Sequence, residues 1–288
     1  MRGDARSMTV LSPRTPAAAV AALSKNPDAL PLAGGTDLMV GWNMGLLNGR
    51  TVVDLSRVVE WKKIAPEKSC VRIGSLVTHA QIQRNTVLRA RFPLLGQSCA
   101  TIGAAQIQNR GTLGGNVANA SPAGDTFPAL AVYGALVRVV GPGGRRTVPF
   151  SGIFAGVKKT TLRPGELIES LELPFPPAAP SRAQFRKVGT RAAQAISKTV
   201  FAGLLWLTRD GTVSDARLAF GSLAPTVRRL HHAEAFLTGR RLDAAAAAGA
   251  AALLTDDVSP IDDIRSTREY RLTVSRNLLV RFLEGGRR

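Results

Sequence analysis

Residues 111–125 read Gly-Thr-Leu-Gly-Gly-Asn-Val-Ala-Asn-Ala-Ser-Pro-Ala-Gly-Asp, a run of glycines and small side chains that ends before an apolar segment. Side chains of this size cannot build a core, and adjacent glycines allow φ > 0 and a close approach by a ligand. We expect a surface loop that turns successive N–H groups toward an anion, with Ser121 capping a helix that begins at Pro122 beside it. The run favours a phosphate site, and a plain glycine-rich connector is the alternative.

A second run of the same kind lies upstream, where two glycines interrupt the apolar approach in Leu32-Ala33-Gly34-Gly35-Thr36-Asp37-Leu38. Two such loops far apart in the sequence suggest one diphosphate held between them. The chain has no G-x-G-x-x-G after a strand and no G-x-x-x-x-G-K-[ST], so neither a Rossmann site nor a P-loop is supported. A dinucleotide must therefore be bound in another way.

These two runs carry a resemblance to a known family. Pro31–Leu38 and Thr101–Leu130, the latter including Gln106–Arg110, are similar to the FAD-binding subunit of molybdenum hydroxylases, the xanthine dehydrogenase and carbon monoxide dehydrogenase flavoprotein family. The resemblance extends along nearly the whole chain. It implies an α+β fold, with a two-lobed FAD-binding domain of the vanillyl-alcohol oxidase type over residues 1–178 and a smaller α+β domain, strands then helices, over residues 179–288.

The resemblance also implies which residues hold FAD. It places Pro31, Leu32, Ala33, Gly34, Gly35, Thr36, Asp37 and Leu38 on one side of the diphosphate, and Thr112, Leu113, Gly114, Gly115 and Asn116 on the other. Asp125 falls where the family has a carboxylate toward ribityl or ribose hydroxyls, a charge-assisted hydrogen bond. Ile168 and Lys187 match flavin contacts, and Ile102 stands where some relatives have an aromatic residue.

Some of these residues have plainer alternatives. Asp125 suits the first turn of a helix, where the dipole stabilises an acid, and Lys187 suits the solvated face of a strand. As a flavin contact, Lys187 would stabilise the reduced anionic ring. We expect FAD to be non-covalent, because neither glycine loop contains a histidine or cysteine that could tether it.

The hydrophobic periodicity and the turn residues predict a mixed order of elements. Helices are expected over residues 15–25, 78–83, 92–102, 126–133, 226–237, 243–254 and 267–282, the first two capped by Thr15 and Thr78. Strands are expected over residues 30–33, 52–55, 71–75, 135–140, 146–150, 167–173, 183–188, 196–208 and 212–220. Gly141–Gly144 is expected to close a hairpin as a four-residue loop.

Other kinds of active site find little support. His79, His231 and His232 include no i,i+4 pair and, with two isolated cysteines, make no recognisable metal site, so a surface or capping role is expected for each. No G-x-S-x-G elbow occurs, and Ser121 has no evident base. We predict no catalytic side chain, because the cofactor brings its own chemistry.

A net charge of +18 is typical of proteins that bind nucleic acid. Aromatic residues, however, are only 5% of the chain, and they do not interleave with the scattered arginines as a base-stacking surface requires. An arginine-rich surface that meets acidic partner subunits is the expectation.

No apolar segment is long enough to span a bilayer. Met1–Met8 lacks the apolar region of a secretory signal, so a cytoplasmic location is expected, with Met1 or Met8 as the natural start. Cys70 and Cys99 are expected to be buried, reduced thiols.

The resemblance implies that the chain is the FAD-carrying subunit of a xanthine dehydrogenase-like molybdenum hydroxylase. The resemblance implies partners, an iron–sulfur subunit and a molybdopterin subunit, with electrons passing from [2Fe-2S] clusters through FAD to NAD or another acceptor. Two cysteines cannot ligate even one such cluster, so the clusters belong on another chain, and the resemblance places molybdopterin on a partner subunit as well. A stand-alone FAD oxidoreductase of the same fold is the alternative, and a basic nucleic-acid-binding protein is a further one.

Overall fold

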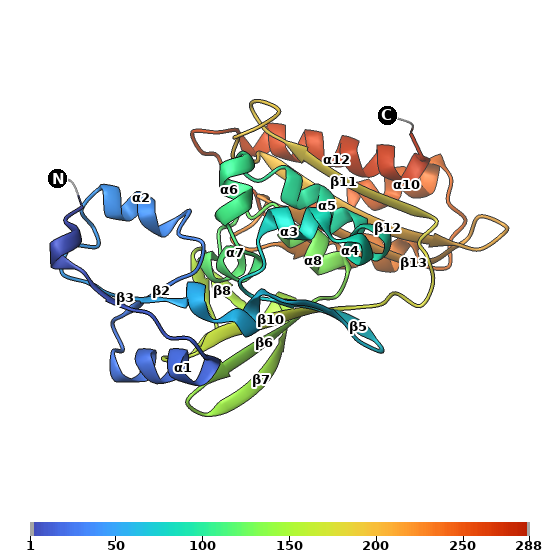
Figure 1. Cartoon of the computed structure of the whole chain (residues 1–288). Coiled ribbons are helices and arrows are strands. Elements are labelled where there is room, and N and C mark those ends of the chain that lie inside the picture. Colours follow the sequence, from blue (N-terminus) through green and yellow to red (C-terminus); the bar gives the residue numbers. More distant parts are fainter. Residues whose placement is uncertain (1–2, 287–288) are drawn as a thin grey trace.

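A computed structural model describes residues 3–286 and shows the predicted mixture of helices and strands in three successive parts (Figure 1). The first part is a small lobe with a parallel sheet of order β1-β3-β2. Its elements are β1 (Thr9–Leu11), α1 (Pro16–Lys25), β2 (Leu30–Leu32), α2 (Leu38–Asn43) and β3 (Thr51–Asp54), with 3-10 turns η1 (Ala5–Ser7), η2 (Leu55–Arg57) and η3 (Val59–Lys62). As predicted, α1 begins after Thr15, whose side chain accepts a hydrogen bond from the Ala18 N–H.

The second part is an antiparallel sheet of order β4-β5-β10-β6-β7 covered by short helices. Its strands are β4 (Ile64–Pro66), β5 (Cys70–Gly74), β6 (Leu136–Gly141), β7 (Gly144–Pro149) and β10 (Leu167–Pro174). Its helices are α3 (His79–Arg84), α4 (Thr86–Arg91), α5 (Pro93–Ala100), α6 (Ala105–Arg110), α7 (Leu113–Asn119) and α8 (Phe127–Val132). A small hairpin, β8 (Phe154–Gly156) and β9 (Lys159–Thr160), follows the 3-10 turn η4 (Phe150–Gly152).

The glycine-rich run 111–125 differs from its prediction, because half of it is helical. Helix α7 starts inside the run, and its cap is Thr112, whose hydroxyl accepts a hydrogen bond from the Gly115 N–H at 3.1 Å. The predicted helix from Pro122 is wrong: Ala120 adopts a left-handed conformation that ends α7, and a turn closed by the Gly124 N–H and the Ser121 carbonyl follows. Thr112 is therefore the helix cap in this run, and Ser121 begins a turn instead of a helix.

The β6–β7 hairpin also differs in its loop. Gly141 pairs with Gly144, so the loop is the two residues between them and not the predicted four. Gly144 has φ +98, a conformation that glycine adopts without strain, and this permits the tighter turn.

The third part is an antiparallel sheet of order β11-β12-β13-β14 with helices on its outer face. Its elements are β11 (Arg182–Val188), β12 (Thr199–Leu207), β13 (Val213–Gly221), β14 (Arg228–Arg229), α9 (His231–Leu237), α10 (Ala244–Ala252), α11 (Leu254–Asp257) and α12 (Arg268–Glu284). The helix expected from residue 226 begins at His231, because the two arginines before it pair with β13.

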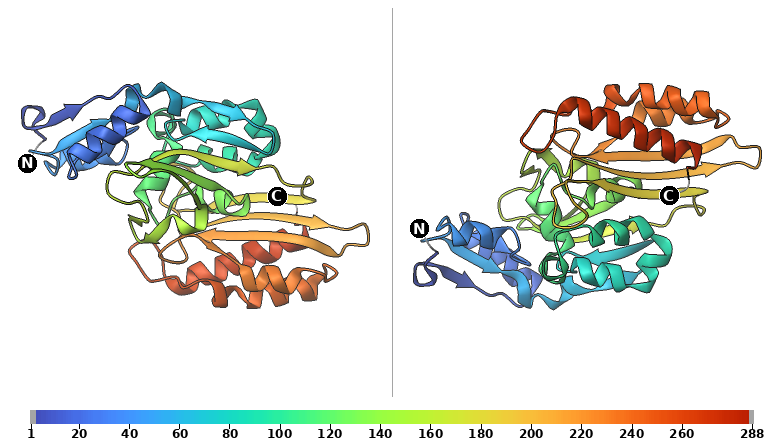
Figure 2. Two further views of the ribbon diagram at one scale, coloured as in Figure 1. Left: turned by 90° about the horizontal axis from the view of Figure 1, so that it is seen from below. Right: turned by 90° about the horizontal axis from the view of Figure 1, so that it is seen from above.

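The parts are stacked in layers (Figures 1 and 2). Helices α3 to α8 lie between the sheet that contains β10 and the sheet that contains β12, and α10 and α12 cover the far face of the latter. Strand β12 is therefore buried on both faces, with Phe201 and Leu205 toward the outer helices and Ala202 and Leu204 toward the second lobe. This explains its nearly continuous apolar sequence, which does not alternate.

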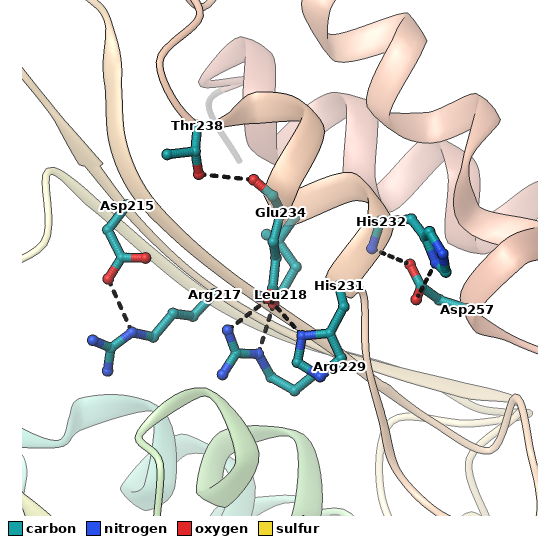
Figure 3. A network of polar contacts seen from close by, with 9 residues as sticks. All are labelled: Asp215, Arg217, Leu218, Arg229, His231, His232, Glu234, Thr238 and Asp257. Carbon is teal, nitrogen blue, oxygen red and sulfur yellow. Dashed lines mark hydrogen bonds and ion pairs between the residues drawn. The ribbon is translucent and has the colours of Figure 1, made fainter.

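Glu234 of α9 joins that helix to the sheet (Figure 3). Its carboxylate accepts hydrogen bonds from the Leu218 N–H of β13 at 2.7 Å and from the Arg229 guanidinium of β14 at 2.6 Å. In the same helix, the exposed His232 Nδ1 lies 3.0 Å from Asp257 Oδ1 of α11. His231 Nδ1 lies 3.3 Å from Glu234 Oε2, and both histidines are exposed, which confirms the expected surface role for this pair.

Among residues 3–286, no helix combines the length and the apolar character needed to cross a membrane. The two cysteines in this part of the chain are buried free thiols, as predicted.

Candidate functional site

A cavity of about 520 Å³ lies between the first and second lobes, where the two glycine runs meet. This volume is in the range of small-molecule and cofactor sites. All the predicted site residues line it except Leu113, Asp125 and Lys187. The lining residues that the prediction named are Pro31, Leu32, Ala33, Gly34, Gly35, Thr36, Asp37, Leu38, Ile102, Thr112, Gly114, Gly115, Asn116 and Ile168.

The first wall is the turn between β2 and α2, and its glycines are required by geometry. A Cβ on Gly34 would lie 1.9 Å from the carbonyl oxygen of Arg110, so the backbones of the two runs touch there. Gly35 has φ +78, which disfavours any other residue. Within residues 3–286, no hydrogen-bond acceptor meets the N–H groups of Gly35, Thr36 and Asp37. They are free to bind an anion.

The second wall is the first turn of α7, and here the prediction of free N–H donors is wrong. The Leu113 N–H donates to the Val77 carbonyl and the Gly114 N–H to the Ser75 carbonyl, each at 2.9 Å. The Gly115 N–H is held by the Thr112 cap. The glycines serve close packing instead, since neither has φ > 0 and a Cβ on Gly114 would lie 2.7 Å from the Ser75 carbonyl oxygen.

Gly115 lines the cavity opposite Ala33. A Cβ there would lie 2.9 Å from the Thr112 hydroxyl and 3.7 Å from the Cβ of Ala33, on the opposite wall. Leu113, two residues before Gly115, points into the core and is fully buried. Its side chain therefore does not line the cavity, whereas its neighbours Thr112 and Gly114 do.

A buried ion pair lies beside the cavity and joins the second lobe to the C-terminal sheet. Lys187 Nζ lies 2.6 Å from Asp125 Oδ2 and donates to the Thr101 carbonyl at 2.9 Å. The Lys187 side chain is only 10% exposed, so the alternative of a solvated strand lysine is wrong. Asp125 precedes the Thr126 cap of α8 and is outside its first turn, so the helix-dipole alternative is wrong as well.

Asp125 keeps one oxygen available. Its Oδ1 is buried and has no hydrogen-bond partner among the described residues. Burial raises the pKa of this carboxyl to about 6, although the charge of Lys187 acts in the opposite direction. An unpaired buried acceptor of this kind is costly unless a donor reaches it.

Sequence reasoning missed His79. It was expected at the surface or as a cap, yet it is 2% exposed and lines the cavity at the start of α3. Thr78 and Gln81 form a capping box that was partly foreseen from Thr78, and this box fixes His79 as the first helical residue. The cap signal predicted the helix but not the direction of this side chain.

The cavity mouth is bridged by side chains from three segments. Lys158 of the β8–β9 hairpin donates to Asn119 Oδ1 at 2.6 Å, and Asn119 Nδ2 donates to Asp37 Oδ1 at 3.2 Å. Lys158 Nζ also lies 3.6 Å from Asp37 Oδ1. These contacts are exposed and individually weak, but they connect both glycine runs.

One group of potential metal ligands occurs among residues 3–286, formed by Glu67, Cys70 and Glu172. Arg72 lies 2.7 Å from Glu67, and Arg138 lies 3.0 Å from Glu172. The arginines neutralise the carboxylates that a cation would need, so this group does not support a metal site.

Comparison with known proteins agrees with this geometry. The family model of the FAD binding domain in molybdopterin dehydrogenase matches residues 6–176, and that of the CO dehydrogenase flavoprotein C-terminal domain matches residues 184–285. The xanthine dehydrogenase FAD-binding subunit of Escherichia coli O157:H7 is 30% identical over 90% of this chain and 88% of its own length. The carbon monoxide dehydrogenase medium chain of Hydrogenophaga pseudoflava is 30% identical over 94% of both chains.

Solved structures give the same result. A chain of carbon monoxide dehydrogenase from Hydrogenophaga pseudoflava matches with a TM-score of 0.91 at 29% identity, covering 98% of this chain and 97% of the other. Quinoline 2-oxidoreductase from Pseudomonas putida 86 matches with a TM-score of 0.90 at 26% identity, again covering 98% and 97%. The predicted resemblance and two-part FAD-binding fold are thus confirmed, and the chain belongs to the family of FAD-binding medium subunits of xanthine and carbon monoxide dehydrogenases, which are oxidoreductases.

Proposed function

We propose that this chain is the electron-transfer flavoprotein of a heteromeric molybdenum hydroxylase, receiving electrons from [2Fe-2S] clusters on a partner subunit and delivering them to NAD or another acceptor. The observation that carries the proposal is the cavity between the two glycine runs, which has the volume and the free N–H donors for a dinucleotide diphosphate. Bound FAD supplies the redox chemistry, because it exchanges electrons singly with clusters and in pairs with nicotinamide.

The residues of this chain then bind and orient the cofactor. The N–H groups of Gly35, Thr36 and Asp37 would donate to the diphosphate, and Gly114 and Gly115 would let it approach the second wall. Asp125 Oδ1 would accept a hydroxyl hydrogen, which would satisfy its unpaired oxygen. Lys187 would hold Asp125 in place and supply positive charge near Ile102. We retain residues 1–178 as the FAD-binding domain and residues 179–288 as the C-terminal domain.

The surface of α2 supports assembly with other chains. Met39, Val40 and Met44 are exposed on or just after this helix, and Leu46 beyond it is 68% exposed. Exposed apolar side chains gathered next to a cofactor cavity are typical of a surface that another subunit covers. We propose that the partners are an iron–sulfur subunit and a molybdopterin subunit.

Purification from the native source is expected to give three polypeptides in one particle. The reason is that the described residues offer a cofactor cavity but no cluster of cysteines for iron–sulfur ligation. Size-exclusion chromatography with iron, molybdenum and flavin analysis of the same fraction checks this. A particle that contains only this chain and flavin, and that oxidises an organic substrate, would favour the stand-alone oxidoreductase instead.

The flavin is expected to be non-covalent. Neither glycine run contains a histidine or cysteine that could tether the flavin, and His79, the only cavity-lining histidine among residues 3–286, lies outside both runs. Precipitation of the holoprotein with trichloroacetic acid should leave FAD in the supernatant, identified by its absorbance and chromatographic mobility. Yellow colour that stays with the washed pellet would contradict this expectation.

A further inference from the structure

His79 is fastened to the second glycine run through its own backbone. Its N–H donates to the Gly111 carbonyl at 3.0 Å, and a Cβ on Gly111 would lie only 3.1 Å from His79 Cδ2 and 3.4 Å from its Nε2. The imidazole therefore lies against the backbone just before Thr112. It shares the cavity wall with Ile102 and Ile107, the end of the cavity nearest the Lys187 contact with Thr101.

The two ring nitrogens of His79 have different surroundings. Nδ1 lies 3.5 Å from the Sγ of Cys99, which is fully buried in α5. Nε2 has no hydrogen bond within the described part of the chain, and it is not one of the buried, partnerless atoms there, so it keeps access to the cavity. One nitrogen is thus committed to the core and the other faces the space for the ligand.

Both groups of the pair are uncharged at physiological pH. Burial lowers the pKa of the His79 imidazole to about 4, so the ring is neutral at physiological pH. Burial also raises the pKa of the Cys99 thiol, which keeps its hydrogen and is a donor. When this thiol donates to Nδ1, the proton of the neutral ring resides on Nε2.

We propose that His79 is a further cofactor-binding residue, a neutral hydrogen-bond donor that directs its Nε2–H at an acceptor atom in the flavin half of FAD, with Cys99 as the positioning residue that selects this tautomer. This inference rests on the proposed FAD site. A neutral donor suits a carbonyl or ring nitrogen of the flavin, since it binds an acceptor without adding a charge to the buried wall. The flavin half is favoured because His79 shares the cavity lining with the apolar Ile102 and Ile107, next to the Lys187 contact with Thr101.

Nitrogen NMR of the full chain tests this directly, because the sequence contains only three histidines. In protein labelled with ¹⁵N-histidine, one imidazole should remain in the neutral Nε2–H form between pH 5.5 and 8, and its Nε2 signal should shift when FAD is added. His231 and His232 are exposed and away from the cavity, so their signals serve as internal controls. FAD that binds without moving the His79 Nε2 signal, or a His79 ring in the Nδ1–H form, would overturn the proposal.

A pair of variants separates the two nitrogens. His79→Gln keeps a donor near the position of Nε2, whereas His79→Asn keeps only a group near Nδ1. FAD titration of the apoprotein, followed by flavin fluorescence, is expected to show affinity within about threefold of wild type for the first variant and roughly tenfold weaker for the second, the value of one hydrogen bond. Equal affinities for both variants would overturn the proposal. Wild-type protein that fails to bind FAD at all would instead remove the proposed function on which it rests.

Discussion

Gly115→Val is expected to weaken FAD binding by at least about 100-fold while the fold persists. The added Cβ would stand 2.9 Å from the Thr112 hydroxyl and 3.7 Å from the Cβ of Ala33, and valine adds two methyl groups beyond it. In the proposed site the diphosphate would lie against this wall, beside the free N–H groups of the first wall. The valine methyl groups would take up that space, and displacing Thr112 would weaken the helix cap by only about 1 kcal/mol.

The measurement is the dissociation constant of FAD from the apoprotein, with thermal unfolding of each variant recorded alongside. Gly96→Val is a matched control, because Gly96 also lies in a helix, α5, and an added Cβ there would have no atom within 4 Å. Both variants bear the same cost of valine in a helix, so only the cavity distinguishes them. Wild-type affinity in Gly115→Val would show that the second wall does not face the phosphates.

Lys187→Met is expected to lower the free energy of unfolding by about 3–5 kcal/mol near pH 8, the usual effect of leaving one partner of a buried pair alone. Methionine fills a similar volume, so the loss reports the uncompensated carboxylate of Asp125. Urea denaturation at pH 8 and pH 5.5 provides the measurement. Lys62→Met, at an exposed lysine outside the cavity, is the control and should change stability by less than about 0.5 kcal/mol.

The sign of the pH dependence follows from the Asp125 pKa. Its folded-state pKa is raised to about 6 from an ordinary value of 3.8, so its titration contributes stability below pH 3.8 that is lost as the pH rises through 6. Without Lys187 the ionised form is still less favourable. The deficit of Lys187→Met should therefore shrink from pH 8 to pH 5.5, and the double variant Asp125→Asn/Lys187→Met should recover most of the loss at pH 8. An equal deficit at both pH values would show that the pair is not electrostatically coupled.

Local signals predicted the elements and the family well. The Thr15 and Thr78 caps, the β-branched runs and the long helix near residue 267 appear close to their expected bounds, because each depends on a few adjacent residues. The glycine runs predicted the position of the cavity for the same reason. Gly34 and Gly35 show both uses of the residue, close approach in one case and φ > 0 in the other.

The sequence does not indicate which way a side chain points or which residues distant in the chain come into contact. Leu113 and Gly114 are neighbours, yet one enters the core and the other faces the cavity, because α7 begins between β5 and the first wall. Lys187 is separated from Asp125 by 62 residues, and its burial depends on the C-terminal sheet closing over the second lobe. His79 was misjudged because its contact with Cys99 forms only when α3 and α5 pack together.

Strand β10 determines the order in which the protein can be completed during synthesis. It occupies the centre of its sheet, between β5 and β6, although it is the last strand of that sheet to leave the ribosome. Until residue 174 emerges, β5 and β6 have no partner between them, and the helices from residue 79 to 132 lack the core contacts that Ile168, Leu171 and Leu173 of β10 provide. Pairings of such long sequence separation form slowly. Nascent chains that stop before β10 therefore expose an open sheet edge to chaperones and to aggregation, and the cofactor site cannot exist before that strand is inserted.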